Sequence, residues 1–257
     1  MRNSKLLSAI VVILTFVFIG LEMFKQHTIG YYLRPLLMPL LTVSYVYKYN
    51  DKSSLFFYFL LSFSISEILG GLGYLFYENM FFDELQYILG SLLNVIAYVL
   101  LALYIYQFID IKKALKKIPL HILIIIILDI YCVVLVSNVS IDGMSQFIDV
   151  YGQNAYGVID YIIEICYNIA IMSLLSISLI NYLLNDSKKS MLLLVGSVCI
   201  LFSEVIQVAY YYIEELLVFE ILYLLALVAA IGIYYTQARL KQEPQQSKFN
   251  LIDKIEA

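Results

Sequence analysis

The sequence has few charged residues and no tryptophan, and the scarcity of charge limits what the chain can be. Charged residues make up only 14% of the 257 residues, whereas 62% are hydrophobic. The mean hydropathy of +0.86 is too high for the surface of a water-soluble globular protein. In hydrocarbon a chain must satisfy its backbone polar groups internally, so it forms helices or a closed barrel. Long apolar runs, rather than alternating strands of about ten residues, favour helices.

The chain also lacks the motifs of soluble enzymes and of metal proteins. No P-loop, GxGxxG, GxSxG, HExxH or CxxC pattern occurs in it. Cys132, Cys166 and Cys199 fall inside apolar runs and show neither a disulfide framework nor metal-ligand spacing. We therefore expect no metal, no cofactor and no nucleic-acid partner. Any function must reside in the membrane-embedded part.

About eight apolar runs have the length that crosses a bilayer. They lie at residues 6–24, 31–47, 55–76, 85–108, 118–136, 158–183, 191–212 and 216–235. The second run is the shortest and contains Arg34, Pro35 and Pro39. The runs predict an all-α membrane bundle of about eight transmembrane helices over residues 1–236, followed by a polar cytoplasmic tail over residues 237–257.

The basic residues favour one orientation of these spans. With the N-terminus in the cytoplasm, all basic residues except Lys25 and Arg34 fall in cytoplasmic segments. The connections on the other side are acidic and include Glu78, Asp83 and Asp142. The positive-inside rule therefore places both termini in the cytoplasm. We expect a multi-pass protein of the cell (cytoplasmic) membrane.

Aromatic and basic residues predict contacts with the lipid interface. Tyrosine occurs 24 times, and many tyrosines cluster at expected span ends, including Tyr31, Tyr32, Tyr234 and Tyr235. This placement is typical of an interfacial aromatic belt. The lysines between residues 112 and 117 indicate contact with anionic lipid headgroups rather than with nucleic acid.

Ionisable residues inside the expected spans are the best functional candidates, because each costs roughly 2.5–3.5 kcal/mol at a helix centre. Glu67 and Glu204 should lie at similar depth in two helices that run in the same direction. Arg34, Asp129 and Glu164 fall at or outside the membrane midplane on the same side. We predict that the two glutamates face one polar cavity in the outer half of the bundle.

Most of these groups also have a purely structural interpretation. Arg34 can neutralise one carboxylate in a buried pair, and Glu220 can extend to the outer interface. Asp129 can be a protonated packing residue that is hydrogen-bonded to a neighbour. The glycines that follow Glu67 favour close helix packing rather than phosphate binding.

Three short stretches contain or flank the intramembrane charges: RPLLMPLL at residues 34–41, FSISEILGG at 63–71 and LFSEVIQV at 201–208. Together they resemble the YhhN family of lysoplasmalogenases, which are eight-span membrane proteins. In that family two aspartates, thought to be the catalytic pair, stand where this chain has Glu67 and Glu204. A family histidine falls at the position that here holds Tyr98. The resemblance implies that the two glutamates are catalytic, and we assign substrate binding to Arg34, Tyr98, Asp129 and Glu164.

The reaction that the resemblance implies is hydrolysis of the vinyl ether of a lysoplasmalogen to an aldehyde and a glycerophospho-alcohol. Protonation of the vinyl carbon creates an oxocarbenium ion, so one carboxyl must donate a proton while another group stabilises the cation and directs water. Acid and base are not assigned individually, because a coupled pair shares its titration. A guanidinium fits phosphate oxygens, so Arg34 would anchor the phosphate of a membrane lysophospholipid.

Two other functions fit the same residues. Buried carboxylates also serve carriers and receptor-like proteins that bind a small lipidic or cationic ligand. Ser66-Glu67 and Ser203-Glu204 recur four expected spans apart, as in a parallel repeat. A non-catalytic scaffold is the third possibility, because a tyrosine does not act as a proton shuttle near neutral pH. These alternatives stay open at the level of the sequence.

Overall fold

The computed structural model describes residues 2–24, 27–49, 54–76, 80–151, 155–212 and 217–238. Its elements in chain order are α1 (Arg2–Met23), α2 (His27–Leu33), the 3-10 helix η1 (Arg34–Leu36), α3 (Leu37–Tyr49), α4 (Leu55–Phe76), α5 (Met80–Tyr106), α6 (Ile111–Lys117), α7 (Pro119–Tyr151), α8 (Ala155–Asn185), α9 (Lys188–Tyr212) and α10 (Leu217–Gln237). Within these ranges every element is helical, which confirms the all-α prediction. Nearly all of the expected tail lies outside the described residues.

Every apolar run expected from the sequence coincides with helix, but the second run is divided. It comprises the end of α2, η1 and most of α3, with Pro35 inside η1. Proline lacks a backbone N–H and clashes with the preceding turn, which explains why regular α-helix is interrupted there. Pro39 is the third residue of α3 and is tolerated in a first helical turn.

Six helices in the described part of the chain are long and apolar enough to cross a membrane: α4, α5, α7, α8, α9 and α10. The apolar stretch found in α1 is shorter and covers Val12–Leu21. The chain therefore has the features of a multi-pass α-helical membrane protein. The total of about eight spans remains a prediction, because α1 and the divided second run do not meet the same criterion.

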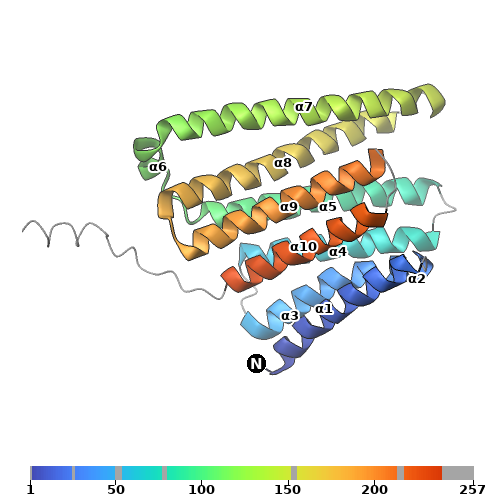
Figure 1. Ribbon diagram of the computed structural model, residues 1–257. Helices are drawn as coiled ribbons and strands as arrows, with labels where there is room; N and C mark the ends of the chain where they lie inside the picture. The colour runs from blue at the N-terminus through green and yellow to red at the C-terminus, as the bar shows by residue number, and fades with distance from the viewer. Residues whose placement is uncertain are drawn as a thin grey trace, which may run out of the picture.

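Successive long helices run in alternating directions between the two ends of the bundle. In Figure 1 the start of α1, helix α6, the α8–α9 connection and the end of α10 lie at the same end. The lysines of α6 and those that begin α9 are thus gathered at the end where the chain starts. This gathering agrees with the predicted charge asymmetry, while the cytoplasmic identity of that end stays a prediction.

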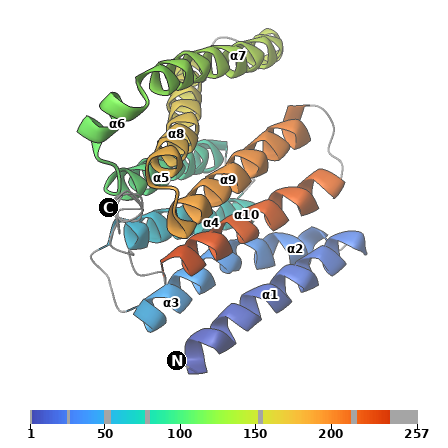
Figure 2. The ribbon, with the colours of Figure 1, turned by 60° about the vertical axis from the view of Figure 1, so that its left-hand side comes forward.

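The helices pack largely in chain order. Helix α3 contacts α1 and α4, α4 contacts α5, and α8 contacts α5, α7 and α9. Helix α10 packs along α9. Figure 2 shows α7 and α1 at opposite edges of the assembly. Helix α7 leaves side chains such as Ile127 and Ile130 exposed by 59% and 61%, as expected for a surface that faces lipid.

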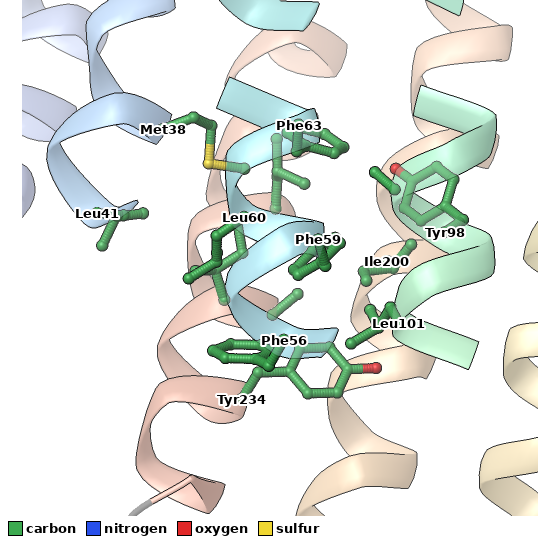
Figure 3. Packing of buried hydrophobic residues seen from close by; sticks show 14 of the residues in the cluster. Met38, Leu41, Phe56, Phe59, Leu60, Phe63, Tyr98, Leu101, Ile200 and Tyr234 are labelled. Carbon is green, nitrogen blue, oxygen red and sulfur yellow. The ribbon is translucent and has the colours of Figure 1, made fainter. Parts of the chain in front are cut away.

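Aromatic side chains fill the centre of the bundle. Figure 3 shows Phe56, Phe59 and Phe63 of α4 facing Tyr98 of α5 and Tyr234 of α10. Tyr98 and Tyr234 are both fully buried, with 0% of their surface exposed. The prediction that Tyr234 belongs to an interfacial belt is therefore wrong. Its hydroxyl lies 2.6 Å from the Ser197 hydroxyl, which satisfies the polar group inside the core.

A close approach between η1 and α4 fixes the position of the second run. A Cβ atom on Gly71 would lie 2.5 Å from Cγ of Pro35, so the contact requires glycine. At the preceding Gly70 a Cβ would meet no atom within 4 Å. The packing interpretation of the glycines that follow Glu67 is thus confirmed for Gly71 but not for Gly70. The contact brings Arg34, the neighbour of Pro35, close to α4.

Candidate functional site

Glu204 on α9 is held at the centre of the bundle by two tyrosines. The Tyr98 hydroxyl of α5 donates a hydrogen bond to Oε1 of Glu204, and the Tyr167 hydroxyl of α8 donates to Oε2 at 2.6 Å. Glu204 is 6% exposed. Both carboxyl oxygens are therefore satisfied by phenol hydrogens, each coming from a different helix.

The two tyrosine rings support each other as well as the carboxyl. Their centroids lie 5.5 Å apart at an interplanar angle of 72°, which is the edge-to-face arrangement that aromatic quadrupoles favour. Phe63 packs edge-on against Tyr98 with a centroid distance of 5.9 Å. Because the rings are fixed by these contacts, the hydroxyl groups are presented to Glu204 in a defined direction.

Glu67 on α4 lies within electrostatic range of Glu204 but differs from it in its contacts. Its carboxyl interacts electrostatically with the Arg34 guanidinium and with Glu204. Its side chain is half-buried, and no residue in the described ranges hydrogen-bonds to it. The neighbouring Ser66 hydroxyl donates to the Gly90 carbonyl at 2.8 Å, which fixes this turn of α4 against α5.

Arg34 lies in η1 between a carboxylate and an aromatic ring of α10. Its Nη1 is 3.9 Å from Oε1 of Glu220, and its Cζ is 4.9 Å from the ring centroid of Tyr223. The Arg34 and Glu220 side chains are 21% and 11% exposed. Arg34 therefore forms the predicted pair with a partly buried carboxylate, and cation–π contact with Tyr223 adds to its anchoring.

Tyr223 of α10 interacts with three of the charged residues described above. The residue is 5% exposed and interacts electrostatically with Arg34, Glu67 and Glu204. Its backbone carbonyl accepts a hydrogen bond of 3.3 Å from the Ser203 hydroxyl, so α10 is tied to α9 one residue before Glu204. We call Arg34, Glu67, Tyr98, Tyr167, Glu204, Glu220 and Tyr223 the carboxyl cluster.

Asp129 lies apart from the carboxyl cluster. Its Oδ1 accepts a hydrogen bond of 2.7 Å from the Ser176 hydroxyl of α8. Ser176 follows Tyr167 by nine residues, which is about 13 Å along a helix. This contact matches the packing interpretation of Asp129 and joins α7 to α8, whereas the assignment to substrate binding stays a prediction. Glu164 is half-buried about one turn before Tyr167 on α8, and its assignment likewise stays a prediction.

Two buried amide atoms next to the cluster have no hydrogen-bond partner within the described ranges. They are Oδ1 of Asn94, one turn before Tyr98, and Nδ2 of Asn168, directly after Tyr167. Buried polar atoms are normally paired with protein, water or ligand. The acceptor and the donor are therefore available to water or to another polar molecule.

Sequence reasoning missed two members of the cluster, Tyr167 and Tyr223. Both follow an intramembrane glutamate by three residues, Tyr167 after Glu164 and Tyr223 after Glu220. This spacing places each tyrosine on the same helix face as a carboxyl, which is the available signal.

The arrangement combines one guanidinium, three carboxyls and three phenols between helices that are apolar elsewhere. Such a set can exchange protons, stabilise a cation and bind an anionic group. No group of three or more His, Cys, Asp or Glu residues that could hold a metal ion occurs in the described part. The chain matches no protein-family model, no curated protein and no solved structure.

Proposed function

We propose that the protein is a membrane-embedded hydrolase that cleaves the vinyl ether bond of lysoplasmalogens, with Glu67 and Glu204 as its catalytic carboxyls. The observation that carries the proposal is the buried Glu204 carboxyl, which accepts hydrogen bonds from Tyr98 and Tyr167 and lies within electrostatic range of Glu67 and Arg34. Ionisable groups inside apolar helices are costly, and proteins retain them mainly where they act on a substrate, ion or proton. The resemblance of the three sequence stretches to the YhhN family supplies the reaction.

The chemistry of vinyl ether cleavage matches this set of groups. A proton is added to the vinyl carbon remote from oxygen, and the positive charge develops on the carbon attached to oxygen. Water adds there, and the resulting hemiacetal breaks its bond to the glycerol oxygen to give an aldehyde and an alcohol. One carboxyl supplies the proton, and the other faces the cation and accepts a proton from water.

Arg34 is the group suited to a lipid phosphate. Its guanidinium keeps 21% of its surface exposed although it contacts Glu220 and Tyr223. Guanidinium and phosphate oxygens make strong charge-assisted hydrogen bonds. A bound phosphate would compete with Glu220 for Arg34 and would hold a single-chain lipid with its vinyl ether near the glutamates.

The proposal is tested with purified protein in detergent or nanodiscs. Lysoplasmalogen should be hydrolysed, while the matching ester and alkyl-ether lysolipids should not, because only the vinyl ether yields a stabilised cation on carbon protonation. Glu67→Gln and Glu204→Gln should each lower kcat by about 100- to 10,000-fold, the usual contribution of general acid–base groups. Equal turnover in either variant would contradict the assigned roles.

Asp186→Asn provides the matched control for these carboxyl-to-amide exchanges. Asp186 is exposed, follows the end of α8 and has a positive φ of 37°, a conformation that asparagine also adopts. Its replacement should leave both turnover and the elution profile of the protein unchanged. A comparable loss of activity in this variant would indicate that the assay reports folding rather than chemistry.

One observation favours a carrier or ligand-binding protein as the second candidate. Ser66 bonds to Gly90 of the next helix, and Ser203 bonds to Tyr223 of the next helix, so the two Ser-Glu pairs occupy similar settings. Carriers are frequently built from such internal repeats. Binding of lysoplasmalogen without turnover in the same assay would favour this candidate over the hydrolase.

A further inference from the structure

We propose that the two glutamates have fixed and different protonation states: Glu204 is the ionised carboxylate held by Tyr98 and Tyr167, and Glu67 carries the transferable proton. The catalytic roles that follow rest on the proposed function, whereas the protonation states themselves do not. Tyr98 and Tyr167 are positioning residues in this scheme, because they act through Glu204.

The contacts of Glu204 fit the ionised form. An ionised carboxylate only accepts hydrogen bonds, and the two phenols supply one hydrogen to each of its oxygens. Hydrogen bonds to a charged acceptor are about twice as strong as neutral ones, and they replace the water lost on burial. A protonated Glu204 would have to donate its own hydrogen to one of the phenol oxygens, and that phenol would have to turn its hydrogen to another acceptor.

The contacts of Glu67 fit the protonated form. Within the described ranges no donor hydrogen-bonds to its carboxyl, so no protein group replaces the water that an ionised Glu67 would lose from the covered part of its half-buried side chain. The cluster contains a single guanidinium, and it forms an ion pair with Glu220 at 3.9 Å. With Glu204 already ionised, a second negative charge at Glu67 would be repelled. Neutral Glu67 avoids both costs.

This division assigns each proton in the reaction. Glu67 gives its proton to the vinyl carbon remote from oxygen, and the π electrons form the new C–H bond. Water then forms a C–O bond to the oxocarbenium carbon and loses a proton to Glu204. When the hemiacetal collapses, its hydroxyl proton passes to Glu67, and Glu204 returns its proton to the departing glycerol oxygen. Both carboxyls end as they began.

In this scheme Tyr98 is a neutral hydrogen-bond donor to Glu204. It stands where the resemblance to the YhhN family implies a histidine, and its hydroxyl is one of the two donors to Glu204. A phenol stays neutral near neutral pH and donates one hydrogen bond. It can therefore keep Glu204 ionised without itself exchanging protons, so that proton transfer is confined to the glutamates.

Infrared spectroscopy tests the protonation states without relying on turnover. The carbonyl absorption of protonated carboxyl groups at pH 7 is compared between the parent protein and Glu67→Gln and Glu204→Gln variants. We expect the Glu67→Gln variant to lose intensity and the Glu204→Gln variant to retain it. Loss in Glu204→Gln alone, loss in both variants or loss in neither would overturn the inference.

The tyrosines provide the second measurement. Tyr98→Phe and Tyr167→Phe keep the rings but remove the donors, so Glu204 should take up a proton and add protonated-carboxyl intensity. Each variant should also have about tenfold to hundredfold lower kcat, the size of one hydrogen bond to a charged group, with a shifted pH profile. Tyr234→Phe is the matched control, since this tyrosine is as fully buried as Tyr98 and bonds to Ser197 instead. Unchanged spectra in both cluster variants would contradict the positioning role.

The spectroscopic outcome is separable from that of the proposed function. If the parent protein does not hydrolyse vinyl ethers but Glu67→Gln alone loses the protonated-carboxyl signal, the hydrolase proposal fails and the inferred protonation states stand. If hydrolysis is observed but the signal belongs to Glu204, the function stands and the assignment of acid and base is reversed.

Discussion

Two adjacent glycines on α4 have different surroundings, and the difference permits a paired mutational test. A Cβ atom on Gly71 would lie 2.5 Å and 2.9 Å from two ring carbons of Pro35, whereas a Cβ on Gly70 would meet nothing within 4 Å. Pro35 directly follows Arg34, so any displacement of η1 also moves the guanidinium. The packing at Gly71 therefore determines where Arg34 lies relative to Glu67.

We expect Gly71→Ala to destabilise the protein by about 1–3 kcal/mol, the usual cost of overpacking a close contact. Gly70→Ala should be neutral or stabilising by up to about 1 kcal/mol, because alanine is the better helix former. Thermal unfolding in detergent measures both variants. A lower melting temperature for Gly70→Ala than for Gly71→Ala would show that η1 does not pack on α4 as described.

The charged members of the carboxyl cluster, and Tyr98 through the family resemblance, are singled out from the sequence, whereas Tyr167 and Tyr223 are not. Glu67, Glu204 and Arg34 are recognisable because a charge inside an apolar run is costly wherever the helix faces. A tyrosine carries no such cost. Because the chain has 24 tyrosines, the sequence does not distinguish a buried hydrogen-bond donor from a tyrosine at the membrane interface. The packing of α8 and α10 against α9 distinguishes Tyr167 and Tyr223 from the other tyrosines.

Helix α6 has the features of an element that lies along the headgroup region. Asp110 caps it by accepting a hydrogen bond of 3.2 Å from the backbone N–H of Lys113. Ala114 and Ile118 are 3% and 9% exposed and pack with Leu184 of α8. Ile111 and Leu115 are exposed by 46% and 57%, beside four exposed lysines at residues 112, 113, 116 and 117. Apolar side chains next to lysines are typical of an interfacial helix.

We expect replacement of these four lysines by glutamine to weaken the association of the protein with anionic phospholipid. Each lysine near an anionic surface contributes about 1 kcal/mol, so the combined loss should be large. Native mass spectrometry of protein released from mixed anionic and zwitterionic nanodiscs measures the retained lipids. Replacement of the same residues by arginine is the control and should preserve retention. Equal retention in the glutamine variant would contradict an interfacial role for α6.

Element boundaries were predictable where the chain is uniformly apolar and less so where it contains proline. The run at residues 55–76 coincides with α4, because the sequence there contains no helix breaker. The second run, singled out for Pro35 and Pro39, is divided into α2, η1 and α3. The prolines predict an interruption of the helix, but the sequence does not show that Pro35 packs against Gly71 of α4.

At the scale of the whole molecule, the two halves of the chain share an order of packing. Helices α1, α3, α4 and α5 follow one another in contact, and so do α7, α8, α9 and α10. In each half the third helix of the series carries a Ser-Glu pair whose serine bonds to the backbone of the fourth. The two catalytic candidates therefore occupy corresponding positions in the two halves, as expected for a parallel repeat with an even number of spans.

This arrangement yields a prediction for the orientation of the bundle. The start of α1, helix α6 and the end of α10 lie at one end, where the lysines of α6 and of the α9 start also gather. Basic residues concentrate on the cytoplasmic side, so this end should face the cytoplasm. In a variant with Cys132, Cys166 and Cys199 replaced by alanine, Lys113→Cys should react with a membrane-impermeant maleimide only after the cells are permeabilised. Gln153→Cys, in the connection between α7 and α8, should react in intact cells, and labelling of Lys113→Cys from outside would reverse the predicted orientation.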